Sequence, residues 1–176
     1  MPTPTASEIE QAIRNVPDFP KPGIQFKDIT PVLADARLFG GTIDLLTAGF
    51  EPGSVDTVVG IDARGFIFAA AAAVKLNAGF VPVRKVGKLP YQTIEQAYAL
   101  EYGTATVAMH VDALKQGSRV LLIDDLLATG GTAAAATSLV EKLGGKILEV
   151  SFLIELGFLN GREKLKPYRV RSLINY

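Results

Sequence analysis

Short apolar runs alternate with segments of helical periodicity through most of the chain. Runs of this length are typical of buried strands, and the segments between them are typical of crossover helices. The predicted strands are residues 56–62, 79–85, 104–111 and 118–124, and KILEVSFLIEL from Lys146. The predicted helices are residues 64–77 and the alanine-rich segment from Thr132, which ends at Gly144 and Gly145. Alternation of this kind predicts an α/β fold with a mostly parallel sheet and helices on both faces.

The first part of the chain follows a different pattern. Ser7 is followed three residues later by Glu10, which predicts a helix with Ser7 as its N-cap, ending before Pro17. Residues 17–31, PDFPKPGIQFKDITP, contain four prolines and several apolar side chains. We expect an ordered loop or an extended arm there, because those apolar side chains can be buried. Residues 34–49 are predicted to be helical.

Residues 86–103 interrupt the alternation. They are polar, are punctuated by Gly87, Pro90 and Gly103, and lie between two predicted strands. An excursion of this length in a compact domain is often a lid or a binding loop. The alternative is a surface β-hairpin without a role. With no internal repeat and no low-complexity linker, we expect one domain over residues 1–176.

Composition excludes several classes of function. The chain has 176 residues, no cysteine and one histidine, His110, so thiolate and His-clustered metal sites are excluded. Eighteen basic residues balance eighteen acidic ones. A nucleic-acid partner is therefore not expected, because such partners select for a basic excess. The chain shows neither a signal-peptide pattern nor an apolar run long enough to span a bilayer, so the expected location is cytoplasmic, with no membrane partner.

The stretch VLLIDDLLATGGT, residues 120–132, carries the clearest chemical pattern. Asp124 and Asp125 end a predicted strand, and ligands of open α/β sheets bind beyond the carboxyl ends of strands. Successive strand residues point to opposite faces. We expect the chain to leave the sheet at this point, so that both carboxylates reach one ligand.

A phosphate cradle is predicted directly after the acids. It consists of Ala128, Thr129, Gly130, Gly131 and Thr132, followed by a helix. Glycines let backbone N–H groups surround an anion, and a helix N-terminus adds unpaired donors. The acids would repel phosphate, so they suit sugar hydroxyls or hydrated Mg²⁺. A phosphate beside a vicinal diol describes a ribose 5-phosphate. The loop is neither a Walker A sequence nor a G-x-G-x-x-G fingerprint.

With these residues, VLLIDDLLATGGT resembles the phosphoribosyl pyrophosphate (PRPP) signature of type I phosphoribosyltransferases. The form DDLLATGGT is similar to the adenine phosphoribosyltransferases among them. Five further segments agree, so that the resemblance runs from about residue 8 to the end. They are PDFPKPGIQFKDITPVL, GIDARGFIF, RKVGKLP, LEYG and GREKL.

The resemblance implies a fold and a reaction. The expected fold is the type I phosphoribosyltransferase fold, with a small hood or lid region. The expected reaction is a Mg²⁺-dependent transfer of the 5-phosphoribosyl group of PRPP to N9 of adenine, giving AMP and pyrophosphate in purine salvage. The expected partners are these substrates and products and a second copy of the chain in a homodimer. Mg²⁺ would be carried by PRPP, with water-mediated contact to Asp124 and Asp125.

A leaving pyrophosphate needs cations, and four basic side chains lie at the carboxyl ends of predicted strands. They are Arg64, after residues 56–62, and Arg84, Lys85 and Lys88, after the apolar run GFVPV at residues 79–83. Arg64 offers a planar fork of donors and the lysines act as point charges. The resemblance adds that Ala63 contributes a backbone N–H and that the Asp62–Ala63 peptide is cis. The alternative for each cation is a solvated surface charge.

The resemblance also implies which residues bind the base and which residue manages its proton. Glu101 of LEYG would manage the proton near N7 of adenine, as the catalytic residue. Phe26 would stack on the purine, the backbone of Gln25 and Lys27 would read its edge, and Leu126 would pack on the other face. A backbone carbonyl at the 6-position accepts from adenine and repels oxo purines. Alternatively, Glu101 is an exposed lid residue and Phe26 is a core aromatic.

Three other functions remain possible from the sequence. A phosphoribosyltransferase for an oxo purine would share the PRPP loop, but PGIQFKDITP argues against it. A PRPP-sensing regulator that binds nucleic acid would need a basic face or an added helix-turn-helix. A generic α/β domain would leave the acid pair and the small-residue loop without a common explanation.

Overall fold

The computed structural model describes residues 3–100 and 103–176. The chain divides into two compact units, residues 1–48 and 49–176. The predicted single domain over residues 1–176 remains a prediction. No helix within the described ranges is long and apolar enough to cross a membrane.

The first unit contains three helices and a two-stranded hairpin. In chain order they are α1 (Ala6–Ala12), β1 (Arg14–Pro17), β2 (Gln25–Asp28), α2 (Thr30–Ala34) and α3 (Ala36–Leu46). The predicted N-cap at Ser7 is wrong, because Thr5 caps α1. The Thr5 hydroxyl accepts from the Glu8 N–H at 3.2 Å, and the Glu8 carboxylate accepts from the Thr5 N–H at 2.8 Å. Thr5 and Glu8 have the same spacing as Ser7 and Glu10, and the earlier pair adds hydrogen bonds at the start of the helix.

The arm at residues 17–31 is ordered, as predicted, and it has strand structure. β1 and β2 are antiparallel, with Val16 opposite Phe26. Phe19 meets Phe26 edge to face, with ring centroids 5.0 Å apart. Asp18 accepts from the Gly23 N–H at 2.8 Å and closes the loop between the strands. Apolar contacts and one short side-chain hydrogen bond therefore order a segment rich in proline.

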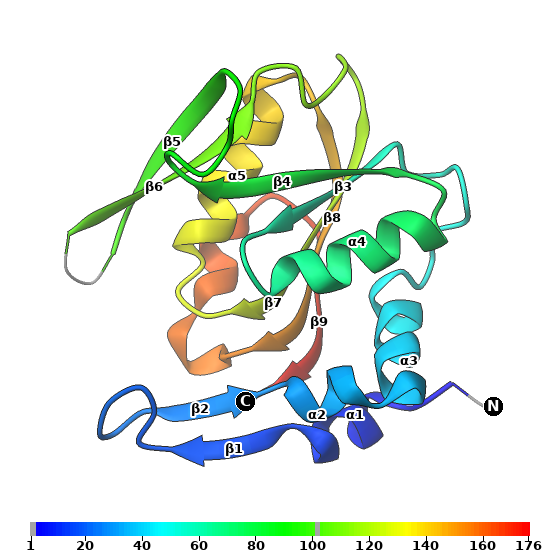
Figure 1. Cartoon of the computed structure of the whole chain (residues 1–176), viewed down its shortest axis with the longest axis vertical. Coiled ribbons are helices and arrows are strands. Elements are labelled where there is room, and N and C mark those ends of the chain that lie inside the picture. Colours follow the sequence, from blue (N-terminus) through cyan, green and yellow to red (C-terminus); the bar gives the residue numbers. More distant parts are fainter. Residues whose placement is uncertain (1–2, 101–102) are drawn as a thin grey trace. The chain divides into compact units, whose positions relative to one another are not determined.

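The second unit is built on a seven-stranded sheet (Figure 1), with strand order β5-β6-β4-β3-β7-β8-β9. β3, β4, β7, β8 and β9 are parallel, whereas β6 is antiparallel to both β4 and β5. The strands are β3 (Thr57–Ile61), β4 (Gly79–Lys85), β5 (Thr93–Ala99), β6 (Thr104–His110), β7 (Arg119–Leu127), β8 (Lys146–Glu155) and β9 (Val170–Asn175). The predicted mostly parallel sheet flanked by helices is confirmed.

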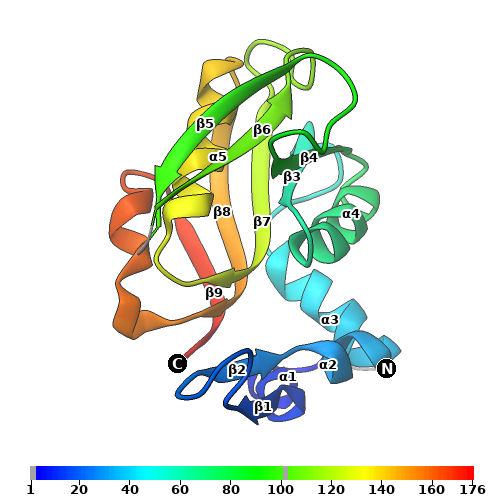
Figure 2. The ribbon, with the colours of Figure 1, turned by 60° about the vertical axis from the view of Figure 1, so that its left-hand side comes forward.

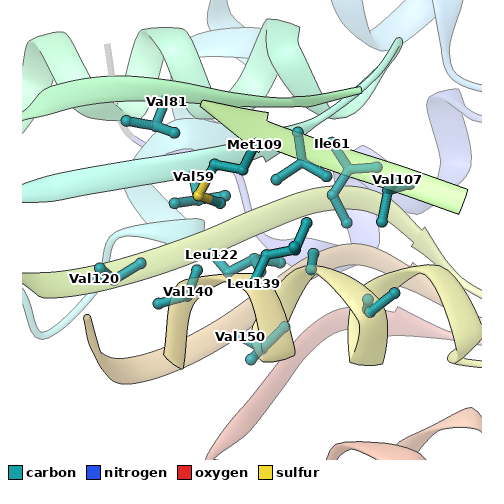
Figure 3. Packing of buried hydrophobic residues seen from close by; sticks show 14 of the residues in the cluster. Val59, Ile61, Val81, Val107, Met109, Val120, Leu122, Leu139, Val140 and Val150 are labelled. Carbon is teal, nitrogen blue, oxygen red and sulfur yellow. The ribbon is translucent and has the colours of Figure 1, made fainter. Parts of the chain in front are cut away.

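Helices cover both faces of this sheet (Figure 1, Figure 2). α4 (Gly65–Lys75) packs on β3 and β7. Gly60 permits this approach, because a Cβ there would lie 2.7 Å from the Cβ of Ala69. α5 (Gly131–Lys142) covers the other face, where Val59 and Ile61 join a buried cluster with Leu139 (Figure 3). Alternate residues of β3 thus serve opposite helices, as strand geometry requires.

The alternative expectation of a β-hairpin at residues 86–103 is confirmed, and two other elements differ from the prediction. Residues 86–103 contain β5, which forms a hairpin with β6 and whose Ile94 and Tyr98 pack against the cluster under α5. The period of two was obscured there by the inward polar side chain of Gln96 and by the outward alanines Ala97 and Ala99. β9 was not expected at all. β7 runs on to Leu127, so the chain does not leave the sheet at the acid pair as expected.

Candidate functional site

The carboxyl ends of three neighbouring parallel strands bring the predicted polar residues together. β4, β3 and β7 lie side by side in that order. Arg84 is the penultimate residue of β4, Asp62 follows β3, and Asp125 lies near the end of β7. The sequence placed these residues at strand ends, and strand order makes those ends neighbours at one edge of the sheet.

The acid pair is held from both sides. Asp125 is buried and forms an ion pair with the half-exposed guanidinium of Arg64. The Asp124 carboxylate accepts from the Asp125 N–H at 2.9 Å. Burial raises the pKa of the Asp124 carboxyl well above its usual range, and the neighbouring Asp125 carboxylate raises it further. Two acids in this setting favour a ligand that brings hydroxyl donors or positive charge.

Gly65 brings the first turn of α4 against Asp124. A Cβ at residue 65 would lie 2.5 Å from the Oδ1 atom of Asp124 and 3.2 Å from its Cα. Any larger residue would separate the helix from the strand. The sequence motif contained Gly65, but a role for it could not be read before the packing was known.

The loop that was predicted to be a phosphate cradle, called the cradle below, lines a small cavity at the start of α5. A cavity of about 90 Å³ opens over it, lined by Asp124 and Leu126 and by the five small residues from Ala128 to Thr132. Gly130 has a φ of +78° and occupies the N-cap of α5, where no side chain caps the helix. The first N–H groups of α5 are therefore left for an anion.

The cradle is supported from behind by Gly161. This residue begins a short 3-10 helix, η2 (Gly161–Leu165), which is the GREKL segment. A Cβ at residue 161 would lie 2.2 Å from the carbonyl oxygen of Ala128. Only glycine fits between this turn and the loop. GREKL was part of the family resemblance, but its role in supporting the cradle was missed.

Arg162 anchors the same turn to the sheet. Its guanidinium donates to both carboxylate oxygens of Glu155, at 3.1 and 2.5 Å, and to the Val170 carbonyl at 2.8 Å. Ser172 donates to Glu155 as well. The hydrogen bonds from Arg162 hold the pKa of the buried Glu155 carboxyl below its usual range. The turn that supports the cradle is thereby tied to β8 and β9.

Arg84, near the end of β4, is also partnered. Arg84 donates to Asp62 at 2.9 Å and to the Lys88 carbonyl at 3.1 Å, and its guanidinium lies 5.9 Å from the ring centroid of Phe66. Lys85 and Lys88 are exposed. The predicted cis peptide between Asp62 and Ala63 is present. Asp62 therefore positions Arg84, a role that the motif did not indicate.

Comparison with known proteins gives the family. Residues 43–175 match the family model described as the phosphoribosyl transferase domain. The adenine phosphoribosyltransferase of Acidothermus cellulolyticus is 56% identical over 175 residues, which is 99% of each chain. The chain belongs to the adenine phosphoribosyltransferase family.

Solved structures of the family agree with this assignment. The crystal structure of the enzyme from Rhodothermus marinus has a TM-score of 0.93 and 52% identity, over 97% of this chain and 98% of that one. The Saccharomyces cerevisiae enzyme was solved with D-2,5-dideoxy-2,5-imino-altritol 1,6-bisphosphate and adenine. It has a TM-score of 0.90 and 42% identity, over 96% of this chain and 97% of that one.

The residues that the resemblance assigned to adenine lie in two different units of the chain. Gln25, Phe26 and Lys27 lie on β2 of the first unit, where Phe26 is half-buried against Phe19. Leu126 lies on β7 of the second unit and lines the cradle cavity. Glu101 lies outside the described residues.

The two carboxylates of the acid pair indicate which metal ion could bind beside the cradle. Within residues 3–100 and 103–176 no three potential protein ligands gather into a metal site. Mg²⁺ is commonly bound through one or two carboxylates together with substrate phosphates and water. Asp124 and Asp125 supply two carboxylates beside the cradle, which fits Mg²⁺ carried by a phosphorylated ligand.

Proposed function

We propose that the protein transfers the 5-phosphoribosyl group of PRPP to N9 of adenine, giving AMP and pyrophosphate, as a step of purine salvage. One observation carries this function. The acid pair on β7 leads directly into a glycine cradle at the uncapped N-terminus of α5. Sugar hydroxyls and a terminal phosphate require these two chemistries at adjacent positions.

Each end of PRPP has its own set of residues. The N–H groups from Ala128 to Thr132 hold the 5-phosphate, because these residues line a cavity at the start of α5, where no side chain caps the helix. Asp124 and Asp125 accept from the ribose hydroxyls. The pyrophosphate is assigned to the Ala63 N–H and to Arg64, Arg84, Lys85 and Lys88. The convergence of strand ends β3 and β4 beside β7 supports this division.

The reaction is a displacement at C1 of the ribose. The bond to pyrophosphate breaks ahead of attack by N9, so the sugar passes through an oxocarbenium-like state, as in glycoside hydrolysis. Cations at the β3 and β4 ends stabilise the negative charge that collects on pyrophosphate. The acids and the cradle hold the ribose in place, which lowers the entropic cost of the encounter. When bound, Mg²⁺ neutralises part of the phosphate charge.

Adenine recognition is assigned to β2 and Leu126, and proton management to Glu101. Backbone groups of Gln25 and Lys27 discriminate the 6-amino group from a 6-oxo group, because a mismatched buried polar group stays unpaired. Phe26 stacks on the ring. The adenine found in the Saccharomyces cerevisiae relative supports adenine as the base.

A homodimer in the cytoplasm completes the proposal. Ile67 and Val74 on α4 and Phe80 on β4 leave apolar surface in water, with Val74 84% exposed. The two elements that carry these residues, α4 and β4, pack against each other in the second unit. Sedimentation of the protein at micromolar concentration tests the homodimer.

The base specificity tests the function. The protein is incubated with PRPP and Mg²⁺ and with adenine, hypoxanthine, guanine or xanthine in separate reactions, and nucleotides are separated by chromatography. AMP from adenine alone is expected. A nucleotide from an oxo purine would overturn the base assignment, and binding of PRPP without any product would favour the PRPP-sensing regulator.

A further inference from the structure

Tyr98 of β5 lies directly against the phosphate cradle. Its ring touches Gly131, where a Cβ would lie 3.0 Å from the Cδ2 atom of the tyrosine. Its hydroxyl is 3.0 Å from the Oγ1 atom of Thr132, which donates to it. Thr132 is a proposed ligand of the 5-phosphate, so Tyr98 is in hydrogen-bond contact with a residue of the binding loop.

The ring of Tyr98 is fixed by the rest of the hairpin. Tyr98 and Ile94 pack against the cluster under α5, and Gln96 lies between them on the same side of β5. The side-chain oxygen of Gln96 accepts from the Ser138 hydroxyl at 3.2 Å and from the Lys142 ammonium at 2.8 Å. Three successive inward-facing residues of β5 thus hold the strand on α5 without any ligand.

The direction of the hydrogen bond between Tyr98 and Thr132 depends on what occupies the cradle. A threonine hydroxyl has one proton to donate and also has acceptor lone pairs. Thr132 donates its proton to Tyr98 in this structure. A phosphate dianion is a stronger acceptor than a phenol oxygen, so its arrival turns the Thr132 proton towards the phosphate. A lone pair of Thr132 then faces Tyr98 and can accept the proton of Tyr98.

We propose that Tyr98 is a positioning residue for the 5-phosphate of PRPP, and that it donates to Thr132 while Thr132 donates to the phosphate. The inference rests on the proposed function of the cradle. The phenol holds the threonine side chain in one rotamer and polarises its hydroxyl, since hydrogen bonds in a chain strengthen one another. Tyr98 does not touch the substrate, so its contribution passes entirely through Thr132.

Binding of ribose 5-phosphate tests this role without the pyrophosphate site. Tyr98→Phe keeps the ring packing on Gly131 and removes only the hydroxyl. We expect the dissociation constant of this variant for ribose 5-phosphate, measured by calorimetry, to rise roughly fivefold, which corresponds to the loss of one neutral hydrogen bond. The melting temperature and the dissociation constant for inorganic pyrophosphate should stay unchanged.

Tyr168→Phe is the matched control. Tyr168 packs against the same cluster, and its hydroxyl meets Glu141 and Thr137 of α5, away from the cradle. Its loss should leave the affinity for ribose 5-phosphate unchanged. A similar loss of affinity in both variants would overturn the inference, because it would show a general loosening of α5.

A double-mutant cycle separates positioning from packing. Thr132→Val removes the intermediate hydroxyl at nearly constant volume and should weaken ribose 5-phosphate binding by about tenfold or more, as expected for a hydrogen bond to a charged group. In the Thr132→Val background, Tyr98→Phe should cost nothing further. A full fivefold cost in both backgrounds would show that Tyr98 acts independently of Thr132, and the inference would be wrong.

Different binding results would overturn the proposed function and the role of Tyr98. If the unsubstituted protein binds neither ribose 5-phosphate nor PRPP, both the proposed function and this inference are overturned. If it binds them with an affinity that Tyr98→Phe does not change, only the role of Tyr98 is overturned.

Discussion

Gly130 and Gly161 lie so close together that neither can carry a side chain. A Cβ at residue 130 would lie 2.3 Å from the Gly161 carbonyl oxygen, and a Cβ at residue 161 would lie 2.9 Å from the Gly130 nitrogen. The atoms met are backbone atoms, which cannot rotate away as a side chain can. The shape of the loop at residues 128–132, the proposed phosphate cradle, therefore depends on a turn some thirty residues further along the chain.

Gly161→Ala should disable the cradle. The added methyl group displaces the loop, and we expect about 1–3 kcal/mol of lost stability, as for other overpacked sites, together with loss of detectable ribose 5-phosphate binding. Gly40→Ala is the control, because nothing lies within 4 Å of a Cβ there and Gly40 is inside α3. That variant should gain about 0.5–1 kcal/mol from helix propensity. Calorimetry and thermal unfolding measure both effects, and normal ribose 5-phosphate binding by Gly161→Ala would contradict the account.

Arg162→Met should loosen the same turn from the sheet. It leaves the buried carboxylate of Glu155 without its cation, and we expect a loss of about 2 kcal/mol, less than for a fully buried pair because Arg162 is partly exposed. The control is Lys166→Met, which breaks an exposed ion pair with Glu163 on the same segment and should cost ~0.5 kcal/mol or less.

The loss in Arg162→Met should also depend on pH. The lowered pKa of Glu155 gives stability that is present above its ordinary value of 4.5 and is lost as the pH falls through the folded-state value. The difference in unfolding free energy between Arg162→Met and the unsubstituted protein should therefore shrink as the pH falls below 4.5. A difference that stays constant over that range would rule out the ion pair as its source.

Asp124→Asn should stabilise the protein while weakening PRPP binding. The amide oxygen can still accept from the Asp125 N–H, and the charge that is costly to bury is gone. Because the folded-state pKa of Asp124 is raised, the unsubstituted protein loses stability as the pH rises from 3.8 towards that value. We expect the variant to lack this fall and to melt about 2–4 °C higher at neutral pH, or about 1 kcal/mol. Lower stability of Asp124→Asn at neutral pH would contradict this.

Arg84→Met should weaken pyrophosphate binding and leave ribose 5-phosphate binding unchanged. A charge-assisted contact is lost, so the dissociation constant for pyrophosphate should rise about tenfold. Arg119→Met is the matched control. Arg119 pairs with Asp56 at the amino-terminal ends of β7 and β3, whereas the candidate site lies at the carboxyl ends. Its removal should not change pyrophosphate affinity, and equal losses in both variants would argue for a general effect of net charge.

Much of the second unit is predictable from the sequence, because its central strands and its helices each carry one clear period. The strand 79–85 matches β4, and Gly144 ends the helix after the cradle with a φ of +78°. β5 was expected only as the alternative hairpin, because the polar side chain of Gln96 interrupts its inward apolar positions. β9 was missed because Arg171 and Ser172 interrupt its short apolar pattern.

Some residues of the candidate site could likewise be predicted from the sequence, and others could not. The sequence predicted Asp124, Asp125 and the small-residue loop, because all of them lie in one continuous stretch of the chain. Asp62, Tyr98 and Gly161 could not be predicted, because each acts through a residue far away in the chain. Asp62 partners Arg84, Tyr98 partners Thr132, and Gly161 supports the cradle. Only the packing of β4, β5 and η2 makes these pairs visible.

Phosphorus NMR of the reaction mixture tests the central claim most directly. The protein, PRPP, Mg²⁺ and adenine are combined, and the resonances of AMP and pyrophosphate are followed with time. The account predicts that the two products appear together, one AMP for each pyrophosphate, and only when adenine is present. PRPP that persists unchanged, or that yields pyrophosphate and ribose 5-phosphate without AMP, would contradict transfer to adenine.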